Sequence, residues 1–86
     1  AGDESLNETD QERLHTVTLP PAGRTLGKTL GSMALPSLGV RLVSLRRADG
    51  MNAPLHDDAL LQGGDVIVLS GKAPALALAE ARLLSG

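Results

Sequence analysis

A glycine-rich turn that leads directly into an apolar strand constrains this chain more than any other feature. Residues 60–71 read Leu-Leu-Gln-Gly-Gly-Asp-Val-Ile-Val-Leu-Ser-Gly. The run over residues 66–69 is apolar at every position, which is typical of a central strand. We expect Gly64 to adopt a positive φ and the Asp65 carboxylate to accept hydrogen bonds from nearby backbone amides. The turn is therefore predicted to be structural rather than catalytic.

Two upstream segments also have strand composition. Residues 14–19 alternate apolar and β-branched polar side chains and end at two prolines, which cannot donate to a sheet ladder. Residues 39–47 form a second β-rich run, in which strict alternation places Arg41 and Arg47 on one face. Its candidates for burial are Val40, Leu42 and Leu45. Residues 53–55 are predicted to form a very short edge strand.

Two segments are predicted to be helical. Residues 29–35 form a short helix with Thr29 as N-cap and with Pro36 ending it. Residues 74–84 form a longer helix that is apolar nearly all round, interrupted only by Glu80 and Arg82. A helix of this kind is covered on more than one side. The order strand, helix, three strands and helix predicts an α+β fold, a small βαβββα domain with a mostly antiparallel sheet.

The composition predicts a thin core. The chain has 86 residues, enough for one domain, and 0% aromatic residues. Aromatic side chains bury the most area, so a small domain without them is a candidate for stabilisation by a second subunit. Cysteine is absent, which excludes a disulfide scaffold and thiolate metal sites. We therefore expect a homodimer that buries the helix over residues 74–84.

Charge is concentrated at the N-terminus. Residues 1–13 carry five carboxylates against one arginine, and we interpret them as a linker or frayed helix preceding a domain over residues 14–86. The remainder carries seven basic and five acidic residues, which is no nucleic-acid footprint. We find neither an apolar run long enough to insert in a membrane nor a signal peptide. The abrupt ends suggest a fragment of something longer.

Two groups of residues are candidates for chemistry. A metal site would have to join His15 and His56 with Asp57 and Asp58, although exposed histidines and turn carboxylates explain the same residues. Residues 27–29 read Gly-Lys-Thr like the end of a P-loop, but Ala22 stands where that motif needs glycine. We predict no catalytic site, no metal site and no cofactor.

Hydroxyl and arginine side chains give no stronger signal. Ser44, Ser70 and Thr29 have no positioned base, so nucleophilic catalysis has no support. The arginines of the second strand run either form a solvated face or bind an anionic ligand. They are Arg41, Arg46 and Arg47.

Taken in order, these elements resemble the TrkA-C domain, the C-terminal domain of regulators of potassium conductance. The matching motifs are Gly27-Lys28-Thr29-Leu30, the run over residues 39–47, and the Gly63-to-Gly71 segment. Residues 77–84 look like the C-termini of bacterial monovalent cation:proton antiporters of the potassium-efflux type. The resemblance covers roughly residues 13–84.

The resemblance implies a dimeric, non-catalytic regulatory domain on the cytoplasmic face of the bacterial inner membrane. Its partners would be a second copy and the rest of the antiporter, including transmembrane and, in many relatives, Rossmann domains. The alternatives are a small-molecule-sensing TrkA-C domain of another transporter or of a soluble regulator, and, from a third class, a hydrolytic enzyme.

In some relatives the dimer cleft binds a cyclic dinucleotide, with an arginine after the short helix. Pro36 stands near that arginine's place, so we expect little or no affinity for a cyclic dinucleotide. A small anionic effector would instead meet the cleft residues Leu35, Pro36, Val40 and Arg41.

Overall fold

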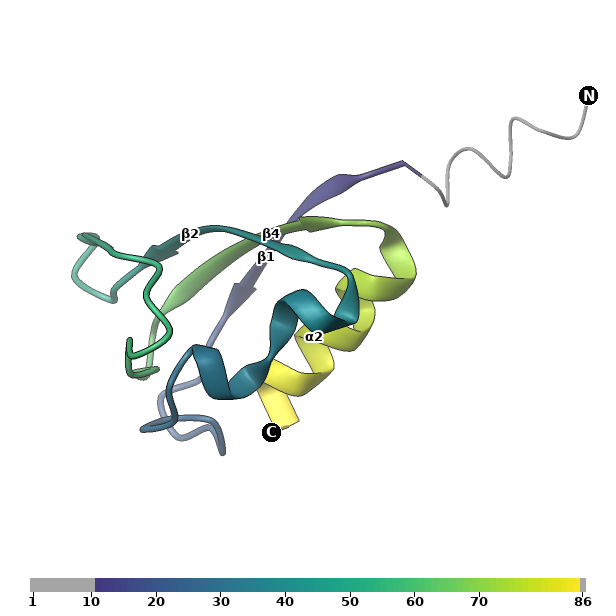
Figure 1. The fold of residues 1–86 in the computed structure, drawn as a ribbon. Helices are drawn as coiled ribbons and strands as arrows, with labels where there is room; N and C mark the ends of the chain where they lie inside the picture. Colours follow the sequence, from purple (N-terminus) through teal and green to yellow (C-terminus); the bar gives the residue numbers. More distant parts are fainter. Residues whose placement is uncertain (1–10, 86) are drawn as a thin grey trace, which may run out of the picture.

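Four strands form one antiparallel sheet in the order β1-β4-β2-β3 within the described residues (Figure 1). They are β1 (Arg13–Thr18), β2 (Arg41–Arg46), β3 (Asn52–Ala53) and β4 (Val66–Gly71). The computed structural model describes residues 11–85, so the interpretation of residues 1–13 as a linker or frayed helix falls almost entirely outside them. The predicted α+β class with an antiparallel sheet is confirmed.

β4 is a central strand, as its apolar sequence predicts. It pairs with β1 on one side and with β2 on the other. Ile67 and Leu69 point into the core and are 0% exposed, whereas Val66 and Val68, on the opposite face, are only half-buried. One face of the sheet is therefore covered within this chain and the other is open.

The helix α2 (Ala73–Ser85) covers the inner face of the sheet (Figure 1). It packs through Leu76, Ala79 and Leu83, three residues that lie on one side of a helix. The core beneath it is almost wholly aliphatic. It comprises Val17, Leu19, Leu30, Met33, Leu35, Val40, Leu45, Leu61, Ile67 and Leu69. The predicted helix over residues 74–84 is confirmed.

The predicted short helix over residues 29–35 is wrong in form. Two 3-10 turns replace it, η1 (Gly31–Met33) and η2 (Leu35–Leu38). Ala34 lies between them with φ 51°, which breaks any continuous helix. Pro36 begins η2 instead of ending a helix, because its fixed φ suits the first turn. Thr29 does accept a hydrogen bond from the Ser32 amide at 3.2 Å.

A register shift in β2 overturns the predicted placement of its arginines. The pairing with β4 jumps between Leu42 and Ser44, so alternation fails at that point. Leu42 and Leu45 both lie opposite core residues of β4, while Arg41 and Arg46 lie opposite the open-face residues Ser70 and Val66. Arg41 and Arg47 therefore do not share a face. The edge strand β3 starts one residue before the predicted residues 53–55.

Candidate functional site

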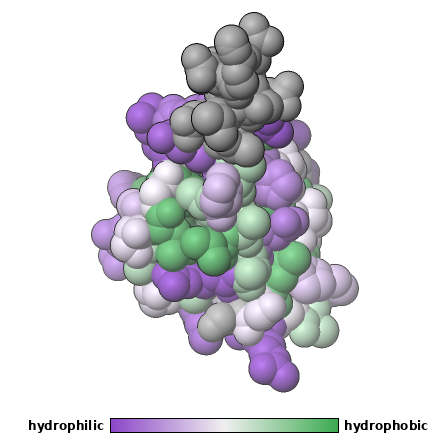
Figure 2. Space-filling model, turned by 90° about the vertical axis from the view of Figure 1, so that its right-hand side faces the viewer, coloured by the Kyte–Doolittle hydropathy of each residue, from purple (hydrophilic) through white to green (hydrophobic). Residues whose placement is uncertain are grey.

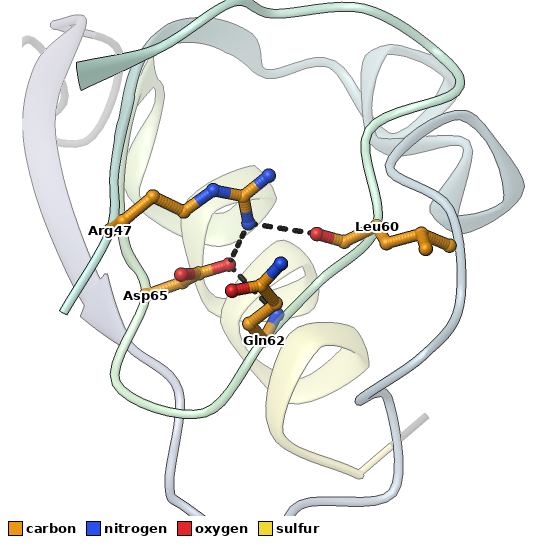
Figure 3. Close-up of polar contacts among 4 residues, drawn as sticks. All are labelled: Arg47, Leu60, Gln62 and Asp65. Carbon is orange, nitrogen blue, oxygen red and sulfur yellow. Dashed lines mark hydrogen bonds and ion pairs between the residues drawn. The ribbon is translucent and has the colours of Figure 1, made fainter. Parts of the chain in front are cut away.

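The polar cluster with the most contacts lies where β2 meets the turn before β4 (Figure 3). Arg47 Nη1 donates to Asp65 Oδ2 at 2.6 Å and to the Leu60 carbonyl oxygen at 2.8 Å. The Gln62 amide donates to the same Asp65 oxygen at 2.8 Å. Asp65 is 0% exposed, so its charge depends on these donors. The cluster closes the loop between β2 and β4.

The predicted turn at Gly64 and Asp65 is confirmed, but the prediction did not include an ion pair. Gly64 has φ +84°, and the Gln62 amide donates to the Asp65 carboxylate, as a structural turn requires. The ion pair to Arg47 was not foreseen, because Arg47 was grouped with arginines of a solvated or ligand-binding face. Asp65 Oδ1 has no hydrogen-bond partner. The cluster is not part of any group of three or more His, Cys, Asp or Glu side chains able to hold a metal ion among residues 11–85.

The four predicted cleft residues divide into two pairs. Leu35 and Val40 are core residues, 0% and 5% exposed, and cannot reach a ligand outside this protomer without repacking. Pro36 and Arg41 are exposed, on η2 and at the start of β2. The structure thus leaves Pro36 and Arg41 as the accessible members of the predicted site.

The outer side of α2 is apolar. Leu78 and Leu84 are 58% and 40% exposed, and Ala77 and Ala81 are exposed on the same outer side. Figure 2 views the side of the molecule on which the β4–α2 connection lies, and hydrophobic residues gather on that face. A helix that is apolar outside as well as inside retains surface for a further contact.

The two histidines lie in different parts of the fold. His15 Nε2 is 3.4 Å from Glu80 Oε1, which links β1 to α2. His56, Asp57 and Asp58 are exposed in the connection between β3 and β4. Residues 11–85 contain no group of three or more side chains able to hold a metal ion.

The Gly27-Lys28-Thr29 segment is not organised as a P-loop. Thr29 forms an isolated bridge with Leu60, and the Leu61 amide donates to the Lys28 carbonyl oxygen at 2.9 Å. The segment is therefore strand-like, and the backbone amides do not converge on one point at the start of a long helix as a P-loop requires.

Sequence reasoning missed two contacts that tie this region to α2. The buried hydroxyl of Thr25 donates to the Leu83 carbonyl oxygen at 2.7 Å, and Arg82 Nη1 donates to the Met33 carbonyl oxygen at 2.9 Å. Both join residues far apart in the chain, so neither has a local sequence signal.

Comparison with known proteins places these features in a family. The model of the TrkA-C domain matches residues 14–84. The crystal structure of the GsuK RCK domain has a similar fold, with a TM-score of 0.62 and 22% sequence identity. The match covers 95% of this chain and 18% of that chain, so the present chain spans a minor part of its structural neighbour.

Two further findings concern related sequences and membrane-spanning helices. No curated protein sequence matches the chain. Within the described residues, no helix has the length and apolar character needed to cross a bilayer.

Proposed function

The chain belongs to the TrkA-C domain family, whose members are regulatory domains associated with potassium transport, and on that premise we propose a more specific function. We propose that it is the non-catalytic regulatory and dimerisation domain of a bacterial potassium:proton antiporter. The observation that carries this proposal is the family match over residues 14–84. The resemblance of residues 77–84 to antiporter C-termini favours this transporter class.

Dimerisation through the outer side of α2 is part of the proposal. Leu78 and Leu84 present apolar area that residues 11–85 of one protomer leave exposed. Burying a leucine contributes about 1.5–3 kcal/mol before association costs. A two-fold contact uses the same surface on both subunits, so both leucines would be buried on each subunit.

Effector binding at the junction of η2 and β2 extends the proposal. Pro36 and Arg41 are exposed there, and a two-fold dimer would present Arg41 twice. Two guanidinium groups suit a small ligand with two negative groups. Pro36 lacks a backbone donor, so we expect weak or no binding of cyclic dinucleotides.

The antiporter proposal also implies a location for the domain. Residues 1–13 would link the domain to the rest of the antiporter, and the domain would lie on the cytoplasmic face of the inner membrane. The alternative is a TrkA-C domain that senses a small molecule for another transporter or for a soluble regulator.

Transport measurements on the polypeptide that carries this domain test the proposal. Everted membrane vesicles loaded with a pH-sensitive dye report proton flux when potassium is added. We expect deletion of residues 14–86 to change the potassium-dependent flux while some transport persists. Unchanged flux, or a parent polypeptide without membrane spans, would contradict the antiporter assignment.

A matched pair of variants tests the effector site in the same assay. Arg41→Ala removes the proposed anion contact, and Arg46→Ala removes a neighbouring exposed arginine of β2. Regulation should change only in Arg41→Ala. Equal behaviour of the two variants would remove Arg41 from the site.

A further inference from the structure

A depression of about 610 Å³ lies between the turn at Lys28 and the C-terminal half of α2. Its lining residues are Lys28, Thr29, Ser32, Met33 and Arg82. The volume falls within the range of small-molecule pockets, roughly 300–1,000 Å³. It is built within one protomer and does not include Pro36 or Arg41.

The backbone beneath Lys28 is held by the segment that precedes β4. The Leu61 amide donates to the Lys28 carbonyl oxygen at 2.9 Å, and the Leu30 amide donates to the Ala59 carbonyl oxygen at 2.7 Å. These two bonds flank the Thr29–Leu60 bridge. The positions of Lys28 and Thr29 are therefore set by a strand-like pairing instead of a loose loop.

Arg82 is fixed from the opposite side. Its Nη1 donates to the Met33 carbonyl oxygen at 2.9 Å, and the side chain is half-buried. A guanidinium group has five N–H donors, so one bond to Met33 leaves capacity for a ligand. The adjacent Leu83 carbonyl accepts from Thr25, which ties the last turn of α2 to the turn that carries Lys28.

The hydroxyl groups have different roles. Ser32 Oγ donates to the Thr29 carbonyl oxygen at 2.7 Å, so its proton is used within the turn. Thr29 Oγ1 accepts from the Ser32 amide at 3.2 Å, which leaves its own proton free to be donated. Thr29 thus adds a neutral donor beside the two cations.

The charge of the depression is positive. Among residues 11–85 it is lined by one lysine and one arginine and by no carboxylate. The Asp57 side chain lies beside Gly31 of η1, where an added Cβ would be 2.7 Å from Asp57 Cβ, and Asp57 does not line the depression. Two cations that line the same depression favour a compact anion with several acceptor oxygens.

We propose that Lys28, Thr29 and Arg82 form a binding site for a phosphate group. The two cations match the charge of a phosphate dianion, and its oxygens accept from the ammonium, the guanidinium and the Thr29 hydroxyl. The site is independent of dimerisation and of the Arg41 cleft.

Amide NMR spectra of the 86-residue chain test the proposal by titration with inorganic phosphate at constant ionic strength, with chloride as the balancing anion. We expect shifts at Lys28, Thr29 and Ser32. Lys28→Gln and Arg82→Gln should each weaken binding by about tenfold, the usual consequence of losing one charged hydrogen bond. The spectra also show whether each variant is folded, and Arg82→Lys should bind more tightly than Arg82→Gln.

Two control variants distinguish a specific site from general charge attraction. Lys72→Gln removes the same charge from an exposed position before α2, and Arg41→Gln removes the cation of the proposed cleft. Both should bind phosphate like the unmodified chain. Equal weakening by Lys72→Gln would overturn the site as general charge attraction. Loss confined to Arg41→Gln would overturn it and leave the cleft proposal standing.

The source of the phosphate group is decided by parallel titrations. Glycerol 3-phosphate represents soluble monoesters, and vesicles of phosphatidic acid in phosphatidylcholine represent a lipid headgroup. Binding of the soluble probes assigns a free or metabolite phosphate, and binding of the acidic vesicles alone assigns a headgroup. No Lys28-dependent binding in any titration would refute the site.

Discussion

Arg47 Nη1 lies 2.6 Å from Asp65 Oδ2, and the two residues join the end of β2 to the turn that starts β4. The pair is unequal, because the Asp65 side chain is 0% exposed and the Arg47 side chain is 22% exposed. Asp65 depends on Arg47 and one amide for compensation of its charge, whereas Arg47 also reaches solvent. The inequality predicts that the two residues respond differently to substitution.

Arg47→Met should lower the free energy of unfolding by about 3 kcal/mol, because it leaves a buried carboxylate with a single donor. Asp65→Asn should cost about 1 kcal/mol, since the amide oxygen still accepts from Gln62 and Arg47 still donates to Leu60. The double variant should be more stable than Arg47→Met alone. Urea unfolding measures all three.

Arg46→Met is the matched control for this pair. Arg46 is the exposed neighbour of Arg47, and its loss should change the free energy of unfolding by less than about 0.5 kcal/mol. Strictly additive costs in the double variant would show that the ion pair carries no coupling.

Gly64→Ala should destabilise the domain more than Gly27→Ala. Both glycines have nearly the same positive φ, +84° and +85°, so both variants pay the same conformational cost of about 1 kcal/mol. A Cβ on Gly64 would lie 2.8 Å from Ala48 Cβ, whereas a Cβ on Gly27 meets nothing within 4 Å. Thermal melts of both variants isolate the steric part.

A second substitution at Ala48 tests the steric contribution to the loss of stability in Gly64→Ala. Ala48→Gly removes the Cβ that a residue at position 64 would meet, so it should restore part of the stability lost in Gly64→Ala. If Gly64→Ala and Gly27→Ala melt at the same temperature, the close approach to Ala48 has no energetic weight.

Thr25→Val should cost about 1–2 kcal/mol by removing the hydroxyl that donates to the Leu83 carbonyl. The last carbonyls of a helix have no partner within it, so Thr25 satisfies one of these acceptors. Thr25→Ser keeps the hydroxyl and should retain most of the stability. Hydrogen exchange should accelerate in the last turn of α2 in the valine variant alone, and equal exchange in both variants would argue against the bond.

Leu78→Gln should weaken self-association by about tenfold or more, because it replaces an apolar side chain on the proposed dimer surface. Met51→Gln is the control, since Met51 is 66% exposed in the connection between β2 and β3 and is not part of α2. Sedimentation velocity over a concentration series measures the association. A monomer at every concentration, or equal weakening by both variants, would disprove dimerisation through this surface.

Local patterns in the sequence were sufficient to predict most of the fold. Apolar runs and turn residues located β1, β2, β4 and α2, and Gly64-Asp65 was predicted as a structural turn. Periodicity failed at the register shift after Leu42, because one extra residue in a strand reverses the faces of all that follow. It failed again at Ala34, where a left-handed residue divides the expected helix into two turns.

The contacts that define candidate sites were beyond prediction for a different reason. Asp65 was recognisable from its turn, but its partner Arg47 directly follows β2, which ends at Arg46 and is far from Asp65 in the chain. Lys28 and Arg82 line the same depression, and hydrogen bonds from Thr25 to Leu83 and from Arg82 to Met33 hold α2 beside the turn that carries Lys28. No spacing or composition rule relates residues that the tertiary fold alone brings together.

The position of β4 sets the order in which the domain can assemble during synthesis. β1 and β2 are made first, yet each finds its main partner only in β4, which is nearly the last element of the chain. A nascent chain that stops before Val66 contains only the short β2–β3 pairing, and β1 has no partner strand. The sheet can therefore close only after β4 has been made, and a truncation that removes β4 together with α2 should abolish folding of the whole domain.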